Sequence, residues 1–437
     1  MFQEVLENIR GFRRPRFPLI TKPLPIGDME MPSLLSFALI SCDGRPYQAQ
    51  VKEGDEVEPG QALGSETGRP VVICPVRGKV TAVIRGADLR GAKMAGAVLV
   101  NPSSDTSPVA FPNGDPESES VDKLWQRMDE SGILTDSLCP RRLSEVIGPD
   151  SGIRVDSLIV LAADREPEVS SALALYQERT QDTAIAARML GRMAGADRVM
   201  AAVPAPLQSE AKSALAGLDI LGIPPAYPQS LEPMVIERAK GTVATRVVSV
   251  ETALAALDAV REGKVQSSKI VTYISPAGES RANLRVPMGT RFRDLFQKQG
   301  LAPRDRDKVI AGGPLRGFTQ YSLDVSVDQG VDAFMLMPRE VIEHWTNEPC
   351  VNCGACIKVC PVKLQPGLLG KSAEFGLFDQ AEDYQIDKCI ECGLCAAVCT
   401  GRRPILQWIR TAKEEIAKKR AAQQASETEK CETEEQQ

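Results

Sequence analysis

The 437-residue sequence has little of what several functional classes require. It contains a single histidine, His344, which argues against haem sites and metal centres that use several imidazole ligands. No apolar stretch approaches the ~18 residues of a membrane-spanning helix. Residues 1–19 hold four arginines but lack the apolar core of a signal peptide. We therefore expect a chain with no membrane span of its own and no export signal.

The overall charge argues against one further class of partner. The formal net charge is −6 at pH 7, which disfavours a general nucleic-acid-binding surface. Hydrophobic residues make up 43% of the chain and charged residues 25%, as in an ordinary globular protein. At ~150 residues per domain, the length predicts about three domains.

Eight of the 12 cysteines form two runs near the C-terminus, at 350–360 and 389–399. Each run has the spacing C-x2-C-x2-C-x3-C, which bacterial ferredoxins use to bind [4Fe–4S] clusters. Three thiolates on one tight loop can reach three irons of a cube, and the fourth cysteine commonly ligates the other cluster. We assign Cys350, Cys353, Cys356 and Cys399 to one cluster, and Cys389, Cys392, Cys395 and Cys360 to the second.

Zinc and disulfides are the alternatives for these cysteines. Structural zinc sites usually take two C-x2-C pairs, whereas each run here supplies three closely spaced cysteines and a fourth. Disulfide frameworks belong to small secreted domains, and the chain shows no export signal. Thr400 stands where proline often follows the fourth cysteine. For the scattered Cys42, Cys74, Cys139 and Cys431 we expect simple thiols in a reducing compartment.

The sequence predicts a multidomain protein of mixed α+β and α/β class. Residues 1–40 contain five prolines and should form an irregular N-terminal arm. Residues 41–100 alternate apolar and polar residues between glycine corners, which indicates short strands. Residues 101–120 are rich in proline, serine and acidic residues and read as a linker.

The middle of the chain alternates strand and helix patterns. Residues 121–267 combine buried-strand runs, such as 157–163, with helical stretches, such as 168–190, and this alternation predicts a layered α/β domain. Residues 268–335 return to strands around one short helix and a glycine-rich loop.

The cysteine runs lie in the last structured region, residues 336–410, with a helical connection between them. Residues 411–437 form a charged tail. Its first part, up to residue 422, should be helical, and the polar composition of 423–437 predicts disorder.

This order of parts resembles the RnfC family of the Rnf electron-transport complex, which is similar to the NADH-binding flavoprotein subunit of complex I. The resemblance is clearest at 285–295, at 311–315 and in the two cysteine runs. It implies a lipoyl-like barrel-sandwich hybrid, an α/β flavoprotein-like domain, a β-grasp ligand-binding-like module and a helical two-cluster ferredoxin domain. The turn near 65–70 lacks the lysine that lipoyl carriers modify, so the first module should be structural.

The flavin and nucleotide motifs of that family are altered in three places. The family's glycine-rich loop corresponds to 132–140, where Leu134 and Leu138 would occupy a ligand's volume. At 161–168, Leu161 replaces an asparagine amide. At 227–233, two glycines are missing and Pro233 replaces a lysine. The three changes together predict that FMN and NADH binding has been lost.

We therefore expect a non-catalytic electron-transfer subunit of a multisubunit, membrane-associated redox complex. It would relay single electrons through two [4Fe–4S] clusters. The expected partners are the other subunits and a ferredoxin-like donor or acceptor. The expected location is cytoplasmic, peripheral on the inner face of the membrane through partner subunits.

Two alternatives stay open. The chain could be an intact FMN-containing, NADH-oxidising subunit of an Rnf-type NADH:ferredoxin oxidoreductase, in which flavin divides a hydride into single electrons. It could also be an assembly or regulatory protein with redox-inert clusters. Flavin absorption bands after the clusters are bleached would favour the first alternative.

Overall fold

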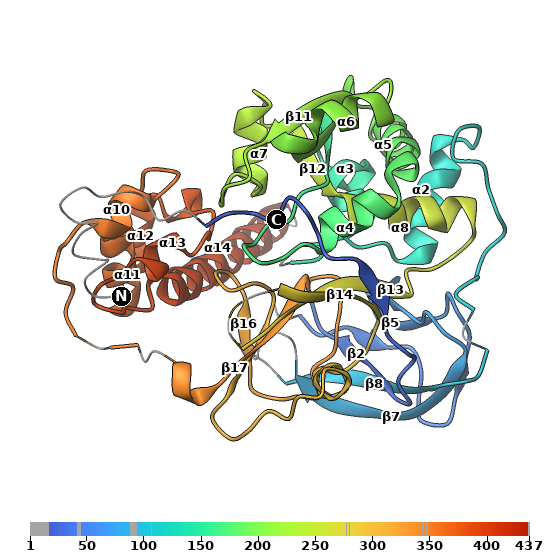
Figure 1. The fold of residues 1–437 in the computed structure, drawn as a ribbon, viewed down its shortest axis with the longest axis horizontal. Coiled ribbons are helices and arrows are strands. Elements are labelled where there is room, and N and C mark those ends of the chain that lie inside the picture. The colour runs from blue at the N-terminus through green and yellow to red at the C-terminus, as the bar shows by residue number, and fades with distance from the viewer. Residues whose placement is uncertain are drawn as a thin grey trace. The chain divides into compact units, whose positions relative to one another are not determined.

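The computed structural model describes residues 17–41, 45–87, 94–105, 107–137, 139–276, 278, 280–342, 345–346 and 348–435 (Figure 1). The chain divides into two compact units, Pro18–Ile342 and Glu343–Gln437 with Met1–Phe17. His344, Leu138 and Cys42 lie outside the described residues, as do the arginines of the N-terminal arm.

The first module of the larger unit consists of two small antiparallel sheets around a shared core. One sheet has the order β2-β8-β7-β4 and the other β3-β5-β6. The strands are β2 (Leu35–Leu39), β3 (Gln48–Ala49), β4 (Glu56–Val57), β5 (Ala62–Glu66), β6 (Arg69–Ile73), β7 (Gly78–Ala87) and β8 (Met94–Pro102). Strand β2 pairs with β8, so the module begins before residue 41, where the sequence pattern had placed its start.

The second module is built on a parallel four-stranded sheet of order β11-β10-β9-β12. Its strands are β9 (Ser157–Leu161), β10 (Arg198–Pro204), β11 (Asp219–Ile223) and β12 (Thr245–Ser249). Its helices are α2 (Val121–Ser131), α3 (Leu143–Ile147), α4 (Ser171–Glu178), α5 (Thr180–Ala194), α6 (Gln208–Ala214), α7 (Glu232–Arg238) and α8 (Val250–Arg261). The layered α/β prediction for this region agrees with these elements.

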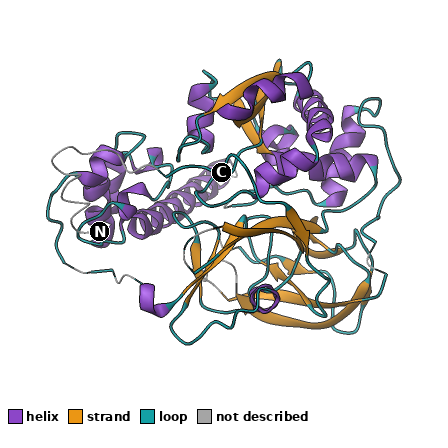
Figure 2. Cartoon of the chain, in the orientation of Figure 1, coloured by secondary structure: helices purple, strands orange, loops and turns teal. Residues whose placement is uncertain are grey.

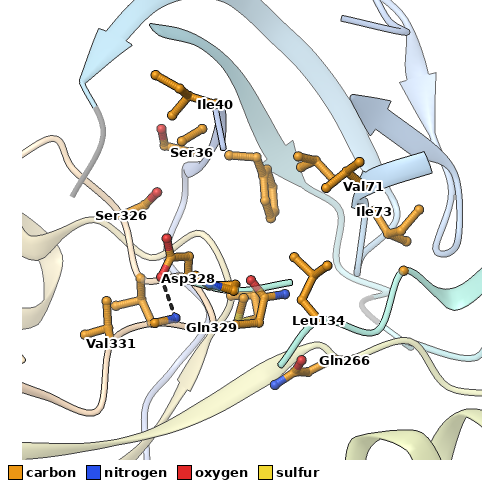
Figure 3. Close-up of a pocket in the computed structure, with 18 of the residues that line it drawn as sticks. Ser36, Ile40, Val71, Ile73, Leu134, Gln266, Ser326, Asp328, Gln329 and Val331 are labelled. Carbon is orange, nitrogen blue, oxygen red and sulfur yellow. Dashed lines mark hydrogen bonds between the residues drawn. The ribbon is translucent and has the colours of Figure 1, made fainter. Parts of the chain in front are cut away.

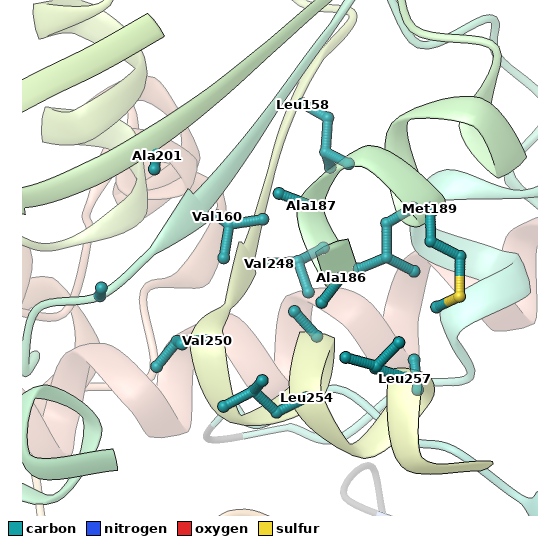
Figure 4. Close-up of a cluster of buried hydrophobic side chains, with 14 of the residues drawn as sticks. Leu158, Val160, Ala186, Ala187, Met189, Ala201, Val248, Val250, Leu254 and Leu257 are labelled. Atoms are coloured by element: carbon teal, nitrogen blue, oxygen red, sulfur yellow. The ribbon is translucent and has the colours of Figure 1, made fainter. Parts of the chain in front are cut away.

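Strand β9 is apolar from Leu158 to Leu161 because both faces of the sheet are covered. Leu158 and Val160 belong to the core formed with α2, α5 and α8. Figure 4 shows part of this core, with labelled side chains of β9, α5 and α8. Ile159 and Leu161 belong to a second core with Val235 of α7. A parallel sheet buried on both faces produces this kind of continuous apolar run.

Two details of this module differ from the sequence-based expectations. The helix expected over 168–190 is interrupted at Arg179, whose backbone has φ −127° and whose guanidinium bonds Asp182 and Asp258. Strand β11, helix α7 and strand β12 were not expected as separate elements.

The third module is a six-stranded mixed sheet of order β1-β14-β13-β17-β15-β16. Its elements are β1 (Ile26–Asp28), β13 (Ser268–Ile274), β14 (Ser280–Pro287), α9 (Phe292–Lys298), β15 (Lys308–Ala311), β16 (Phe318–Gln320) and β17 (Ala333–Met337). Phe292, Phe296 and Phe334 lie in its core, where the rings of Phe296 and Phe334 are 5.6 Å apart at 80°. Strand β1 shows that part of the expected N-terminal arm belongs to this sheet.

The described elements of the smaller unit are helices, as Figure 2 shows by colour. They are α10 (Ala355–Val359), α11 (Pro366–Glu374), α12 (Phe378–Asp383), α13 (Leu394–Ala397) and α14 (Ile405–Glu435). The prediction of disorder over 423–437 is wrong as far as Glu435, because α14 continues through this segment. Alanine, glutamine, glutamate and lysine, which make up most of it, are good helix formers.

Candidate functional site

Four cysteines from both runs line one cavity in the smaller unit. Cys350, Cys353 and Cys356 come from the first run and Cys399 from the second, around a space of about 30 Å³. Apolar side chains of α14 and the backbone of Gly367 complete the wall. A second cavity, of about 20 Å³, is lined by Cys389, Cys392, Cys395 and Cys360.

The two runs have the same backbone geometry at corresponding positions. The residue before the second cysteine of each run has a left-handed φ, +54° at Asn352 and +52° at Glu391. The glycine after that cysteine has a φ of +73° at Gly354 and +74° at Gly393, a conformation that glycine adopts at little cost. A short helix, α10 or α13, follows each glycine. These turns bring three thiols of one loop to the same side.

Backbone donors also approach the sulfurs in matching ways. The amide of Leu364 donates to Cys360 Sγ at 3.3 Å, and the amide of Arg403 donates to Cys399 Sγ at 3.5 Å. Thr400 Oγ1 lies 3.5 Å from Cys353 Sγ, so the residue that replaces the usual proline reaches the first cavity. Such donors stabilise a sulfur that carries negative charge, as a metal-bound thiolate does.

The cavities differ in their access to solvent. Cys350 and Cys353 are exposed, whereas Cys392 and Cys395 are buried. Burial raises the pKa of Cys395 and of Cys389, so these thiols favour the protonated form unless a metal takes the place of the proton.

The arrangement fits a four-iron cluster better than a single ion. Among the residues that the structure describes, no three His, Cys, Asp or Glu side chains converge as ligands of one metal ion do. A cube of iron and sulfur is wider than one ion, so its ligands stand further apart. Four cysteines line each cavity, which is the number of ligands that one such cluster takes.

The cysteines outside the two runs differ from one another. Cys74 is a buried thiol in the first module, its Sγ bonds the carbonyl of Val76 at 3.1 Å, and burial raises its pKa to about 11. Cys139 is disulfide-bonded, so the expectation of a simple thiol is wrong there.

In the larger unit, the three altered motif segments lie against one another. Arg165 of 161–168 pairs with Asp136 of 132–140, at 2.8 Å between NH2 and Oδ1. Ser230 of 227–233 donates to the backbone carbonyl of Asp164 at 2.7 Å. The sequence could not show these contacts, since they join residues that are far apart in the chain.

Arg165 belongs to a network of five charged side chains. Lys269 Nζ lies 3.0 Å from Asp136 Oδ1, 2.8 Å from Glu251 Oε2 and 3.3 Å from Asp332 Oδ1. Arg165 NH2 also lies 3.3 Å from Asp332 Oδ2. Lys269, Asp136 and Glu251 are buried, while the side chains of Arg165 and Asp332 are 19% and 22% exposed. The sequence pattern did not reveal this network, although a lysine inside the apolar stretch of β13 was a signal.

The glycine-rich loop after β15 packs against protein. The amide of Leu315 donates to Glu166 Oε2 at 3.0 Å. A Cβ added at Gly313 would lie 2.4 Å from Glu166 Cγ, so the close approach that this glycine permits is to Glu166. The loop is thus in contact with the segment that follows β9.

An apolar cavity of about 140 Å³ also lies in the larger unit, between the first module, the 131–140 segment and the six-stranded sheet. Figure 3 shows Val71 and Ile73 of β6 near Leu134, with Gln266 and Asp328 also at its edge. The Oδ1 atom of Asp328 accepts from the amide of Gly330 at 2.7 Å. Leu134, which was expected to crowd a ligand, thus lines this cavity.

Comparison with known proteins agrees with the two-sheet architecture of the first module and with the cysteine-lined cavities of the smaller unit. A family model described as RnfC barrel sandwich hybrid domain matches residues 9–105, and one described as 4Fe-4S dicluster domain matches residues 345–400. The C subunit of a Na+-translocating ferredoxin:NAD+ oxidoreductase complex from Acetobacterium woodii is 26% identical over an alignment of 432 residues, and the alignment covers 94% of this chain and 97% of that protein. The chain is RnfC-like.

Two further similarities accompany this assignment. The RnfC-like chain is 27% identical over 391 residues to the C subunit of a proton-translocating ferredoxin:NAD+ oxidoreductase complex from Clostridium ljungdahlii, covering 85% of this chain and 86% of that one. A crystal structure of an NAD+-reducing [NiFe]-hydrogenase matches with a TM-score of 0.45 and 14% identity over 68% of this chain and 62% of its own. A similarity that low does not establish a shared fold. Within the described ranges, every helix is too short or too polar to cross a bilayer.

Proposed function

We propose that this RnfC-like chain is an electron-transfer subunit of a multisubunit, membrane-associated redox complex. The observation that carries the proposal is the pair of cavities in the smaller unit, each lined by four cysteines. The match to a dicluster domain over residues 345–400 supports the same function.

We assign a crossed set of ligands to two clusters. Cys350, Cys353, Cys356 and Cys399 would hold one, and Cys389, Cys392, Cys395 and Cys360 the other, in line with the residues that line each cavity. A bound [4Fe–4S] cluster supplies one-electron redox chemistry. The chain contributes the thiolates, the amide donors at Leu364 and Arg403, and the apolar walls that limit water.

The module names follow from the resemblance together with the topology. We propose that residues 121–267 form a flavoprotein-like α/β domain, supported by the parallel sheet β11-β10-β9-β12. We propose that residues 268–335 form a β-grasp module, supported by the antiparallel pair β13–β14, the helix α9, and the parallel pairing of β13 with β17. The 41–100 module with β2 corresponds to the barrel-sandwich hybrid.

The flavoprotein-like domain does not fit FMN or NADH. Arg165 and Asp136 bond each other where the family's loops would face a ligand, and Glu166 fills the space beside Gly313. A flavin and a nicotinamide need close backbone approach on at least one side. We therefore propose that both binding sites are lost, and the NADH-oxidising alternative is not favoured.

The partners follow from the relatives' complexes. We propose that the other subunits of a membrane redox complex hold this chain at the cytoplasmic face of the membrane. A ferredoxin-like protein or a neighbouring subunit would donate or accept the electrons. The exposed cysteines Cys350 and Cys353 support electron exchange through the first cluster.

The test is the metal content of anaerobically purified chain. We expect about eight iron and eight acid-labile sulfide per chain, from two four-iron clusters, and an EPR signal from both clusters after dithionite reduction. A preparation that holds zinc, or four iron at full occupancy, would contradict the two-cluster assignment.

A further inference from the structure

The parallel sheet of the larger unit has a topological switch point between β9 and β12. From β9 the chain crosses to its neighbour β10, and from there to β11 on the same side. Strand β12 then pairs on the opposite side of β9. In open α/β sheets, ligands bind in the crevice at the carboxyl ends of the strands at such a point.

Charged side chains follow both strands at this place. Arg165 comes shortly after β9, which ends at Leu161. Glu251 lies in the first turn of α8, directly after β12 ends at Ser249. Both belong to the five-residue network that also contains Asp136, Lys269 and Asp332.

The network binds the walls of the crevice to each other. The amide of Asp136 donates to Thr252 Oγ1 of α8 at 2.8 Å, and its carbonyl accepts from Arg165 NH1. Lys269 of β13 reaches Glu251 and Asp136, so the neighbouring six-stranded sheet is attached as well. Side chains thus join β13 directly to the segments around Asp136, Arg165, Glu251 and Asp332.

The charges are nearly balanced inside the network. Three carboxyl groups face two cations, and burial raises the pKa of both Glu251 and Asp332, which favours one retained proton. Burial opposes the ionised form of Asp136 too, but Arg165 and Lys269 outweigh it and hold its pKa below the usual range. With one proton retained, the two remaining carboxylates match the two cations.

We infer that this five-residue network occupies the ligand crevice of the α/β domain and takes the structural place of a bound cofactor. The inference deepens the part of the proposed function that concerns flavin loss, and it is independent of electron transfer by the clusters. Entry of a ligand would require separating Arg165 and Lys269 from their carboxylates, which would leave buried charges unpaired. The crevice should therefore stay closed in the native chain and open when Arg165 is removed.

The experiment compares Arg165→Met with Arg154→Met by amide hydrogen exchange of the full cluster-loaded chain. Arg154 pairs with Asp197 on the surface of the same module, and both side chains are mainly exposed, so its loss is a matched control. We expect exchange over 132–137 and 161–168 to rise at least about tenfold in Arg165→Met and to stay unchanged in Arg154→Met. Equal exchange in wild type and Arg165→Met would overturn the inference.

A second measurement does not depend on any variant folding. Wild-type chain is incubated with FMN or with NADH at millimolar concentration, and exchange over the same peptides is recorded. We expect no change, because the crevice is already filled. Protection of 132–137 or 161–168 by either compound would refute the inference, while iron content and EPR of the same sample report on the cluster relay separately.

Discussion

At single positions, the crossed set of cysteines is the main feature that can be tested. Cys360 belongs to the first run but lines the cavity of the second. Its sulfur accepts the amide of Leu364, as Cys399 accepts that of Arg403. The fourth cysteine of each run thus accepts a backbone amide in the same way, and each lines the cavity of the other run.

We predict that Cys360→Ser damages the cluster of the second run. After reduction, the EPR spectrum of Cys360→Ser should resemble that of Cys392→Ser, because both variants replace a ligand of the same cluster. It should differ from the spectrum of Cys353→Ser, which alters the other cluster. Cys74→Ser, a buried thiol in the other unit, is the control and should keep about eight iron. A Cys360→Ser spectrum equal to that of Cys353→Ser would show that the ligand sets are not crossed.

The buried carboxyl group of Glu251 predicts a pH effect on stability. Burial raises its pKa to about 7, against about 4.3 in an unfolded chain. Between about pH 4.3 and about pH 7, the native state therefore keeps a proton on Glu251 that the unfolded state has lost. The contribution of Glu251 to the free energy of unfolding should be greatest below the pKa of the unfolded chain. It should fall as the pH rises toward about 7, by up to about 1.4 kcal/mol per pH unit.

Glu251→Gln tests this effect. Glutamine cannot titrate, so the slope of the free energy of unfolding between pH 5.5 and 7.5 should flatten in the variant. The exposed Glu53→Gln is the control and should keep the wild-type slope. The slope, not the absolute stability, is the measured quantity, and an unchanged slope in Glu251→Gln would disprove the assignment.

At the scale of elements, loops and strand ends decide whether the α/β domain has room for a ligand. The turn that includes Gly312 and Gly313 connects β15 to the loop before β16 and lies against Glu166. Gly312 has φ +92°, a backbone conformation that favours glycine. At Gly313 the reason for glycine is steric, because a Cβ would meet the Glu166 side chain. The glycine-rich loop therefore serves packing between two modules.

We predict that Gly313→Ala lowers the free energy of unfolding by about 1–3 kcal/mol, because its Cβ would meet the Glu166 side chain near its base. Chemical denaturation followed by circular dichroism measures this. Gly27→Ala in β1 is the control, since the nearest atoms to an added Cβ are 3.8 Å away, and it should be tolerated. A neutral Gly313→Ala would mean that Glu166 moves aside easily and that the loop retains room for a ligand.

At the scale of the whole molecule, we propose that the chain combines a cluster-binding unit with a domain whose cofactor crevice is filled. We predict that purified chain reconstituted with FMN retains no stoichiometric flavin after gel filtration. NADH should not bleach the visible absorption of the clusters, whereas dithionite should. Tight, stoichiometric FMN together with bleaching by NADH would restore the NADH-oxidising alternative.

Part of the fold was readable from the sequence because it depends on local pattern. The continuous apolar run of β9 follows from the residue pattern, and the glycine corners of the first module follow from turn chemistry. The sequence pattern assigned β2 to the irregular N-terminal arm and the end of α14 to a disordered tail, and the structure differs at both places. Strand β2 is held by pairing with β8, which is distant in the chain, and the polar sequence of the tail permits both helix and disorder.

By itself, the sequence determined the cofactor chemistry, because the spacing within each cysteine run fixes which thiols can share one loop. It also pointed to the three altered motifs, since missing glycines are visible without coordinates. Only the tertiary structure showed which charged side chains meet beside the altered motifs. The five charged side chains come from five separate segments: Arg165, Asp136, Glu251, Lys269 and Asp332. Their attraction exists only once the fold has brought each cation within 2.8 to 3.3 Å of its carboxylate partners.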